Sequence, residues 1–344
     1  MTEAAQPSGF LELISPAFAL GWARHAPHGP AYIAAMLGDE ILGIARAETP
    51  RADLAQLQET GRPAGSFIVL FNRELDTADL TRVALHRLDD HSALPPIAEL
   101  RFDSSPIRRI FVLGSPRSGT SELGATLQRV YDLPWMGEFH GAPLFAAPAA
   151  AIQQEMSKDD DLSHFIGAYR LDESILRLAR LTYFGVHGSA SFIDKTPGVP
   201  MIAAAPFLAR CFPDAKFIYL RRNGVSNVLS RMAKFGGDFS EHCADWAAAL
   251  TEWERVRALL PHYLELRQED MQNNPTETAS RIAEYIGTPD TAPALAASLS
   301  SGRLERTGAG IGRTRLADTG WGPLQIQRFI DVCGPAMERF GYEM

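Results

Sequence analysis

The stretch Ile110-Phe-Val-Leu-Gly-Ser-Pro-Arg-Ser-Gly-Thr-Ser121 decides the fold expected for this 344-residue chain. Its first four residues are apolar, as in a buried strand, and the residues after it, Ser121–Tyr131, have a helical pattern. Between them, Gly114 and Gly119 have the spacing of the two glycines in a phosphate-binding P-loop. A strand, a glycine-rich loop and a helix in this order direct backbone N–H groups toward an anion. The sequence therefore predicts an anion-binding loop, and the alternative is a connection that needs glycine only for its turn.

One position of this loop differs from the loop of ATP-binding proteins. Thr120 stands where those proteins have the lysine that holds the β- and γ-phosphates, although Ser121 keeps the hydroxyl of the next position. Arg117 instead supplies a permanent cation with a planar fork of donors. We therefore predict a cradle for a phosphate or a phosphosulfate, not for a triphosphate.

A second strand–helix junction follows about a hundred residues later. Lys216–Leu220 resembles a buried strand, and Val225–Lys234 has a helical pattern. Arg222 closes the strand, and Ser230 lies eight residues further on, so a cation and a hydroxyl can converge on one anion. The alternative is that Arg222 and its neighbouring arginine are solvated surface charges. The strand before the loop is expected at Arg109–Leu113, and further helices are expected at Glu241–Leu260 and Thr276–Ile286. This alternation of strands and helices predicts an α/β domain with a mainly parallel sheet.

Both segments resemble the donor-binding motifs of sulfotransferases that use 3′-phosphoadenylyl sulfate (PAPS), in their bacterial and Golgi-type form. Pro116-Arg-Ser-Gly-Thr120 is similar to the 5′-phosphosulfate loop, and Arg222 with Ser230 to the 3′-phosphate motif. The resemblance spans residues 107–344 and implies a P-loop-like, three-layer α/β domain. It implies PAPS as donor, adenosine 3′,5′-bisphosphate (PAP) as product and no metal requirement. The donor-binding residues that it implies are Ser115, Pro116, Arg117, Ser118, Gly119, Thr120, Ser121, Arg222 and Ser230. Gly224 and Ser226 depart from the proline and aspartate that the family often has, at capping positions.

The resemblance also implies catalytic residues. Glu138, in Trp135-Met-Gly-Glu-Phe-His140, lies where protein-tyrosine sulfotransferases and related bacterial enzymes place a glutamate, which implies that it is the general base. His140 is the alternative base, because cytosolic members use a histidine. Lys195, in Asp194-Lys-Thr-Pro197, would stabilise the bridging oxygen of the scissile sulfate, with Asp194 orienting it and Arg117 adding positive charge. The alternatives are a satisfied polar residue at Glu138 or His140 and a surface turn at Lys195.

The C-terminal part of the chain carries weaker similarities. Leu264–Met271 resembles the strand and acidic turn of the family, although Gln268 stands where a tyrosine is frequent. In related enzymes a late segment closes over the donor, which implies a 3′-phosphate contact from Arg313 or Arg315. A surface loop without a ligand is the alternative for this glycine- and arginine-rich segment.

The first hundred residues have a different pattern, which predicts a small all-β, sandwich-like accessory domain over residues 1–104, followed by the sulfotransferase domain at 105–344. Short apolar runs alternate with turn residues, a short helix is expected near Arg51–Gln58, and Ala93–Pro106 resembles a linker. The expected strands are Ala31–Leu37, Glu40–Ala47 and Ser66–Asn72. The segment resembles β-sandwich modules appended to bacterial enzymes of surface glycan synthesis, which implies a saccharide or glycoconjugate acceptor. A spacer or an oligomerisation module is the alternative, so an oligomer is compatible with the sequence.

Composition limits the partners. The net charge of −8 disfavours DNA or RNA as a partner, because proteins that bind these polymers are usually basic. It does not disfavour a single nucleotide. The three cysteines are far apart and form no CxxC, which favours reduced thiols in the cytoplasm. The chain has no run of about 18 apolar residues, so we expect no membrane span, and its beginning does not resemble a signal peptide.

The resemblance to sulfotransferases, with these patterns, implies an enzyme that moves a sulfuryl group to a hydroxyl or amine of a small-molecule or glycan acceptor. A P-loop kinase or other phosphotransferase is one alternative, which the missing lysine and the Arg222–Ser230 pair disfavour. A non-catalytic nucleotide- or glycan-binding protein is the other, which the presence of Glu138 and Lys195 disfavours.

Overall fold

The computed structural model of the protein describes residues 8–54, 63–102, 107–158, 171–301 and 315–344. Its contacts group the chain into two compact units, of which the first comprises residues 1–107 with 181–190 and the second comprises residues 108–180 with 191–344. The sequence-based division into independent domains at residues 104 and 105 stays a prediction.

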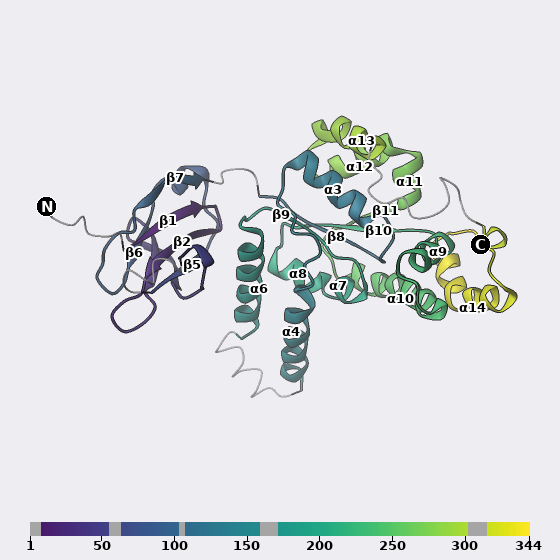
Figure 1. Ribbon diagram of the computed structural model, residues 1–344, viewed down its shortest axis with the longest axis horizontal. Helices are drawn as coiled ribbons and strands as arrows, with labels where there is room; N and C mark the ends of the chain where they lie inside the picture. The colour runs from purple at the N-terminus through teal and green to yellow at the C-terminus, as the bar shows by residue number, and fades with distance from the viewer. Residues whose placement is uncertain (1–7, 55–62, 103–106, 159–170, 302–314) are drawn as a thin grey trace. The chain divides into compact units, whose positions relative to one another are not determined.

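The second unit is built on a parallel sheet between two layers of helices (Figure 1). The strand order is β11 (Leu264–Arg267), β10 (Lys216–Arg221), β8 (Arg109–Gly114) and β9 (Phe192–Lys195), and each neighbouring pair is parallel. This arrangement confirms the predicted α/β class with a parallel sheet. The predicted strands and helices around the two segments expected to bind anions agree with the structure to within a few residues.

Helices cover both faces of this sheet. On one face lie α3 (Thr120–Tyr131), α11 (Gln268–Asn273), α12 (Pro275–Ile286) and α13 (Ala292–Ser301); on the other lie α7 (Val199–Ala203), α8 (Ala205–Cys211), α9 (Gly224–Phe235) and α10 (Phe239–Arg257) (Figure 1). Other helices in the described ranges are α4 (Ala142–Met156), α6 (Leu171–His187), η2 (Pro289–Thr291), η3 (Leu316–Asp318) and α14 (Pro323–Arg339).

The alternation of side chains along β8 explains why the sheet is buried on both faces. Ile110 and Val112 belong to an aliphatic core shared with α3, α12 and α13. Phe111 points to the opposite face, where it stacks on Phe217 at 5.2 Å between ring centroids and meets the edge of Phe192 at 5.7 Å. Strands buried on both faces have near-continuous apolar sequences, which is the pattern that made β8 and β10 recognisable.

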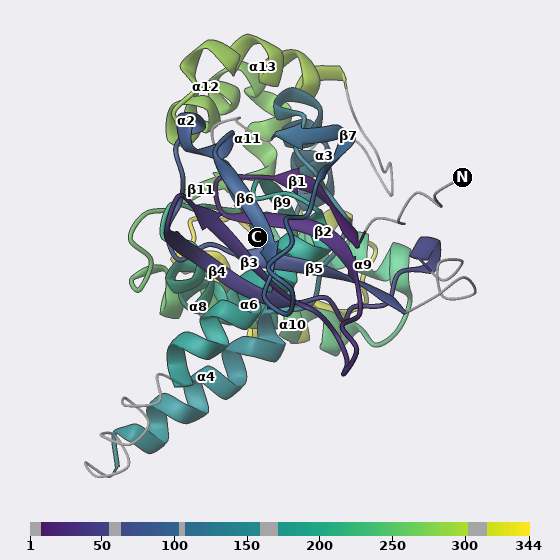
Figure 2. The same cartoon turned by 90° about the vertical axis from the view of Figure 1, so that its left-hand side faces the viewer.

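The first unit contains two mostly antiparallel sheets, which can be followed in Figure 2. One has the order β5-β2-β1-β7 and the other β4-β3-β6, and side chains from both contribute to one apolar core. The strands are β1 (Gly9–Ile14), β2 (Phe18–Arg24), β3 (Tyr32–Leu37), β4 (Glu40–Arg46), β5 (Ala64–Leu70), β6 (Val83–Arg87) and β7 (Pro96–Phe102). A small β region is therefore present, as predicted, and β1, β2 and β6 are strands that the sequence interpretation missed.

Two local predictions for the first unit need correction. The expected linker Ala93–Pro106 is wrong over β7, which pairs in parallel with β1. A proline is tolerated here because Pro96 is the first residue of a strand at the edge of its sheet. Of the helix expected near Arg51–Gln58, the structure has the 3₁₀ turn η1 (Ala52–Leu54), and residues 55–58 lie outside the described residues.

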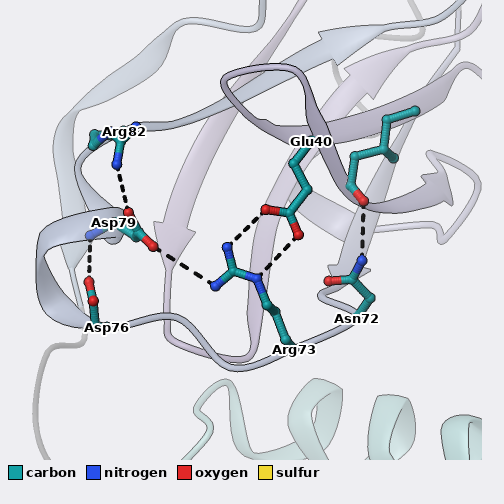
Figure 3. Close-up of polar contacts among 7 residues, drawn as sticks. Glu40, Asn72, Arg73, Asp76, Asp79 and Arg82 are labelled. Atoms are coloured by element: carbon teal, nitrogen blue, oxygen red, sulfur yellow. Dashed lines mark hydrogen bonds and ion pairs between the residues drawn. The ribbon is translucent and has the colours of Figure 1, made fainter.

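A polar network lies on the surface of the first unit (Figure 3). Arg73 donates two hydrogen bonds to Glu40, at 2.9 and 3.2 Å, and lies 3.9 Å from Asp79. Asp76 caps the short helix α2 (Thr77–Leu80) through the backbone N–H of Asp79. Since the Arg73 and Glu40 side chains are 44% and 42% exposed, we assign their ion pair little weight in the stability of the unit.

Two further properties bear on the sequence-based expectations. The three cysteines, Cys211, Cys243 and Cys333, are buried free thiols. Across the ranges given above, every helix is too short or too polar to cross a membrane.

Candidate active site

The glycine-rich loop begins where β8 comes closest to its neighbour β10. A Cβ atom added to Gly114 would lie 2.3 Å from the carbonyl oxygen of Leu220, so the strand can end here only with glycine. Gly119 has φ of 88° and is the N-cap of α3, where a side chain would lie 2.9 Å from Gln268 Cγ. Because glycine has no side chain to cap the helix, the first N–H groups of α3 are left to a ligand or water.

The polar residues of the loop are mostly buried. Ser115, Ser118 and Thr120 are each at most 3% exposed, and Ser121 is half-buried in the first turn of α3. Arg117 has φ of 71°, in the left-handed region that non-glycine residues seldom adopt. A backbone held in this conformation requires support from its surroundings.

That support comes from the second predicted anion-binding motif. Arg222 Nη1 donates to the backbone carbonyl oxygen of Arg117 at 2.9 Å, and Arg117 Nε donates to Ser230 Oγ at 3.2 Å. The two motifs, about a hundred residues apart in sequence, therefore meet directly. Burial lowers the pKa of Arg222, while the nearby Glu269 carboxylate opposes that shift.

Trp246 and Asn223, which the sequence interpretation did not single out, help to hold Arg222 and α9 in place, as does Gly224. The indole N–H of Trp246 donates to the Arg222 carbonyl oxygen at 3.1 Å. Asn223 caps α9 by accepting from the backbone N–H of Ser226 at 3.3 Å. A Cβ atom on Gly224 would lie 2.9 Å from the Trp246 ring, so the glycine allows α10 to approach.

Glu138 and Lys195 form an ion pair at the end of β9. Lys195 Nζ donates to Glu138 Oε1 at 2.5 Å, and it lies 5.8 Å from the centroid of the Trp135 ring. The Lys195 side chain is only 5% exposed, whereas that of Glu138 is 42% exposed. His140 Nε2 lies 3.5 Å from Glu138 Oε2, and its side chain is 68% exposed. A buried cation is thus paired with an accessible carboxylate.

The segment that carries Glu138 is attached to β9 by hydrogen bonds. The backbone N–H of Ile193 donates to the Pro134 carbonyl oxygen at 3.0 Å. Thr196 Oγ1 lies 3.1 Å from the Phe139 carbonyl oxygen and 2.6 Å from Asp194 Oδ1. Asp194 therefore contacts Thr196, and its role in orienting Lys195 stays a prediction.

The parallel sheet brings these groups to one edge. Lys195 pairs in register with Val112, and Leu220 with Gly114, so the carboxyl ends of β8, β9 and β10 lie together. Open α/β sheets bind their ligands at this edge. Of the two late arginines, Arg315 is exposed at the start of η3, and Arg313 lies outside the described residues. Within the described ranges, no group of three His, Cys, Asp or Glu side chains could hold a metal ion.

A sequence model described as the sulfotransferase family matches residues 109–292, which is more than half of the chain and includes both anion-binding motifs, Glu138 and Lys195. The chain belongs to the sulfotransferase family. This sulfotransferase is 31% identical over 151 residues to the nodulation protein NoeE of Sinorhizobium fredii, a match that covers 41% of the chain and only 35% of NoeE. It is 23% identical over 257 residues to protein-tyrosine sulfotransferase 1 of Danio rerio, covering 68% of the chain and 72% of that protein.

Among solved structures, this sulfotransferase is similar to the sulfotransferase domain from the curacin biosynthetic pathway. The identity is 17%, the match covers 70% of this chain and all of that domain, and the TM-score is 0.40. The likeness of the first unit to modules of glycan-synthesis enzymes stays a prediction.

Proposed function

We propose that this sulfotransferase moves the sulfuryl group of PAPS to an acceptor hydroxyl by in-line transfer, with Glu138 as the general base. The observation that carries the proposal is the ion pair of Glu138 and Lys195 at the same sheet edge as the glycine-rich loop. Sulfuryl transfer requires a base for the acceptor and a cation for the developing charge, and this pair supplies both.

The choice of donor rests on the two anion-binding motifs. The loop around Arg117 and the N-terminus of α3 would hold the 5′-phosphosulfate, and Arg222 with Ser230 would hold the 3′-phosphate. A nucleotide with anionic groups at both positions fits this pair of sites better than ATP does, since the loop lacks the P-loop lysine. Arg117 and Ser230 bind each other in the free protein, and each would exchange that contact for an anionic oxygen of the donor. PAP would be the second product.

The proposed reaction exchanges one S–O bond for another. The acceptor oxygen attacks sulfur while the bond from sulfur to the bridging phosphate oxygen breaks, and Glu138 takes the acceptor proton. The leaving phosphate oxygen gains negative charge, which the Lys195 ammonium group stabilises once it turns from Glu138 to the donor. Arg117, Lys195 and the N–H groups of α3 supply positive charge without a metal ion.

The acceptor class follows from weaker observations. Glu138 is accessible, so the base can meet a hydroxyl presented from solvent. We place a saccharide or glycoconjugate hydroxyl first, because the N-terminal β region resembles modules of glycan-synthesis enzymes. A tyrosine hydroxyl is the second candidate, because the Danio rerio relative is named a protein-tyrosine sulfotransferase. Reduced, buried thiols fit the proposed cytoplasmic location.

Transfer of labelled sulfate from PAPS to saccharide, tyrosine-peptide and small phenol acceptors tests the proposal. We expect a labelled product that depends on PAPS, and PAP should raise the melting temperature more than ATP does. Equal or greater stabilisation by ATP, together with magnesium-dependent ATP turnover, would replace sulfuryl transfer with phosphoryl transfer. Stabilisation by PAP without transfer to any acceptor class would favour a non-catalytic nucleotide-binding protein.

A further inference from the structure

Asn227 joins the two donor-binding motifs through one buried amide group. It lies on α9 between Arg222 and Ser230 and is fully buried. Its Nδ2 donates to the Pro116 carbonyl oxygen at 3.0 Å and to Ser118 Oγ at 3.1 Å. A single side chain of α9 therefore holds the glycine-rich loop on both sides of Arg117.

The chemistry of its partners fixes the orientation of this amide. The Pro116 carbonyl oxygen only accepts hydrogen bonds, so the NH₂ group of Asn227 must face it; the reversed amide would place two oxygens together. Ser118 Oγ accepts the second N–H, so the hydrogen of the Ser118 hydroxyl must point away from Asn227. Within the described residues that hydroxyl hydrogen meets no acceptor, so it is available to an anion in the loop.

Neighbouring hydrogen bonds also join the glycine-rich loop to the segment from Arg222 to Ser230. Pro116 is bound by Asn227, the backbone of Arg117 by Arg222, and Ser118 again by Asn227. Arg117, at the centre, has the left-handed backbone conformation that needs such support. Loss of the Asn227 contacts would therefore release the loop on both sides of Arg117, the residue with the left-handed backbone.

The remaining atom of the amide carries a cost in stability. Asn227 Oδ1 is buried and finds no partner in the part of the chain that the structure describes. An unsatisfied buried oxygen is destabilising, and a leucine of similar size would avoid it. The Pro116 carbonyl oxygen would then keep only its longer hydrogen bond, from Ser115 Oγ at 3.4 Å.

We propose that Asn227 is a positioning residue that fixes the loop against α9 and turns the Ser118 hydroxyl toward the bound anion. The identity of that anion, the 5′-phosphosulfate of PAPS, rests on the proposed function. By this link the helix that binds one end of the donor also sets the geometry at the other end.

Nucleotides that carry one or both phosphates separate this role from general structural support. Calorimetric titration of the full chain would compare PAP with adenosine 3′-phosphate in wild type, Asn227→Leu and the control Val228→Ala, which alters the next, fully buried residue of α9. We expect Asn227→Leu to weaken PAP binding about tenfold, the size of one hydrogen bond to a charged group, and to change 3′-phosphate binding less than about twofold. The melting temperature of Asn227→Leu should stay within about 4 °C of wild type.

A double-mutant cycle tests the route through Ser118. Ser118→Ala should weaken PAP binding several-fold, about the value of one hydrogen bond, and Asn227→Leu with Ser118→Ala should be no weaker than Asn227→Leu alone. If the losses of PAP affinity in the double mutant multiplied, the proposal would be overturned. It would also be overturned if Asn227→Leu weakened the binding of both nucleotides equally, or if Val228→Ala behaved like Asn227→Leu.

Amide hydrogen exchange without nucleotide keeps this proposal distinct from the proposed function. The N–H groups of Ser118 and Gly119 should exchange about tenfold faster in Asn227→Leu and at the wild-type rate in Val228→Ala. If wild type bound neither nucleotide, the proposed function would fail, and exchange alone would decide the role of Asn227. Faster exchange would then support it, and unchanged exchange would overturn it.

Discussion

The proposed donor side of the site comprises Ser115–Ser121 and Arg222–Ser230, and its polar groups bind one another in a largely buried network. The acceptor side comprises Trp135–His140, in which Glu138 and His140 are exposed and outside helices and strands. Lys195 is a buried cation whose side chain, among the described residues, donates a hydrogen bond to Glu138 of the acceptor side. For the proposed roles, the difference predicts that the backbone of the donor side is held in place before binding, whereas the acceptor meets exposed side chains. Substitutions should therefore affect binding on the donor side and turnover on the acceptor side.

The largest effect is expected for Glu138→Gln. Glutamine keeps the shape of the side chain but cannot accept the acceptor proton, so kcat should fall about 10²–10⁴-fold. The dissociation constant of PAP should change less than about twofold, because removing the negative charge of an exposed side chain has little effect on the binding of the nucleotide. Steady-state kinetics and calorimetry measure the two quantities. A kcat within about tenfold of wild type would assign proton transfer elsewhere.

Lys195→Met tests the buried cation of the site. Methionine preserves an apolar stem against Gly124 and Trp135 while removing the ammonium group. We expect kcat to fall about 10²–10³-fold, because the leaving oxygen loses its cation. A variant that folds normally and turns over at the wild-type rate would place Lys195 outside the chemistry. Circular dichroism and thermal melting serve as the control for folding.

Arg222→Ala should act on binding. Loss of the charged guanidinium group that would bind the 3′-phosphate should weaken PAP binding about 10–100-fold. The affinity for adenosine 5′-phosphate, which lacks that phosphate, should fall less. Arg222→Lys keeps the charge without the planar fork and should fall between wild type and alanine. Equal weakening of both nucleotides would show that Arg222 supports the loop only through the Arg117 carbonyl.

The smallest effect is expected for His140→Ala. Its side chain is mostly exposed and 3.5 Å from Glu138, so kcat should change less than about threefold. The same assay that tests Glu138→Gln checks this variant. A loss as large as that of Glu138→Gln would make the histidine the base and contradict the proposed assignment.

The sequence was sufficient for features that depend on local patterns. Buried parallel strands such as β8 and β10 are continuous apolar runs, and the loop between β8 and α3 has glycines at fixed spacing. The link between Glu138 and Lys195 depends on β9 pairing beside β8, and the two partners are 57 positions apart in the chain. Only the family resemblance pointed to that pair.

Features that depend on long-range packing could not be predicted. Asn227 and Trp246 acquire their roles from the loop and from Arg222, which local periodicity does not encode. β2 was not predicted, because Gly21 interrupts its apolar pattern. The glycine is needed there because a Cβ atom would lie 2.2 Å from the carbonyl oxygen of Phe10 on β1.

The hydrogen bond from Trp246 to the Arg222 carbonyl oxygen has a practical consequence. The indole is 1% exposed, packs against Gly224 and is bound to the backbone of the residue that would hold the 3′-phosphate. Its ultraviolet emission depends on the polarity around the ring and on the partner of its N–H. The protein thus carries a natural fluorophore at its donor side, and nucleotide binding could be followed by titration without a label, with Trp246→Phe as the blank.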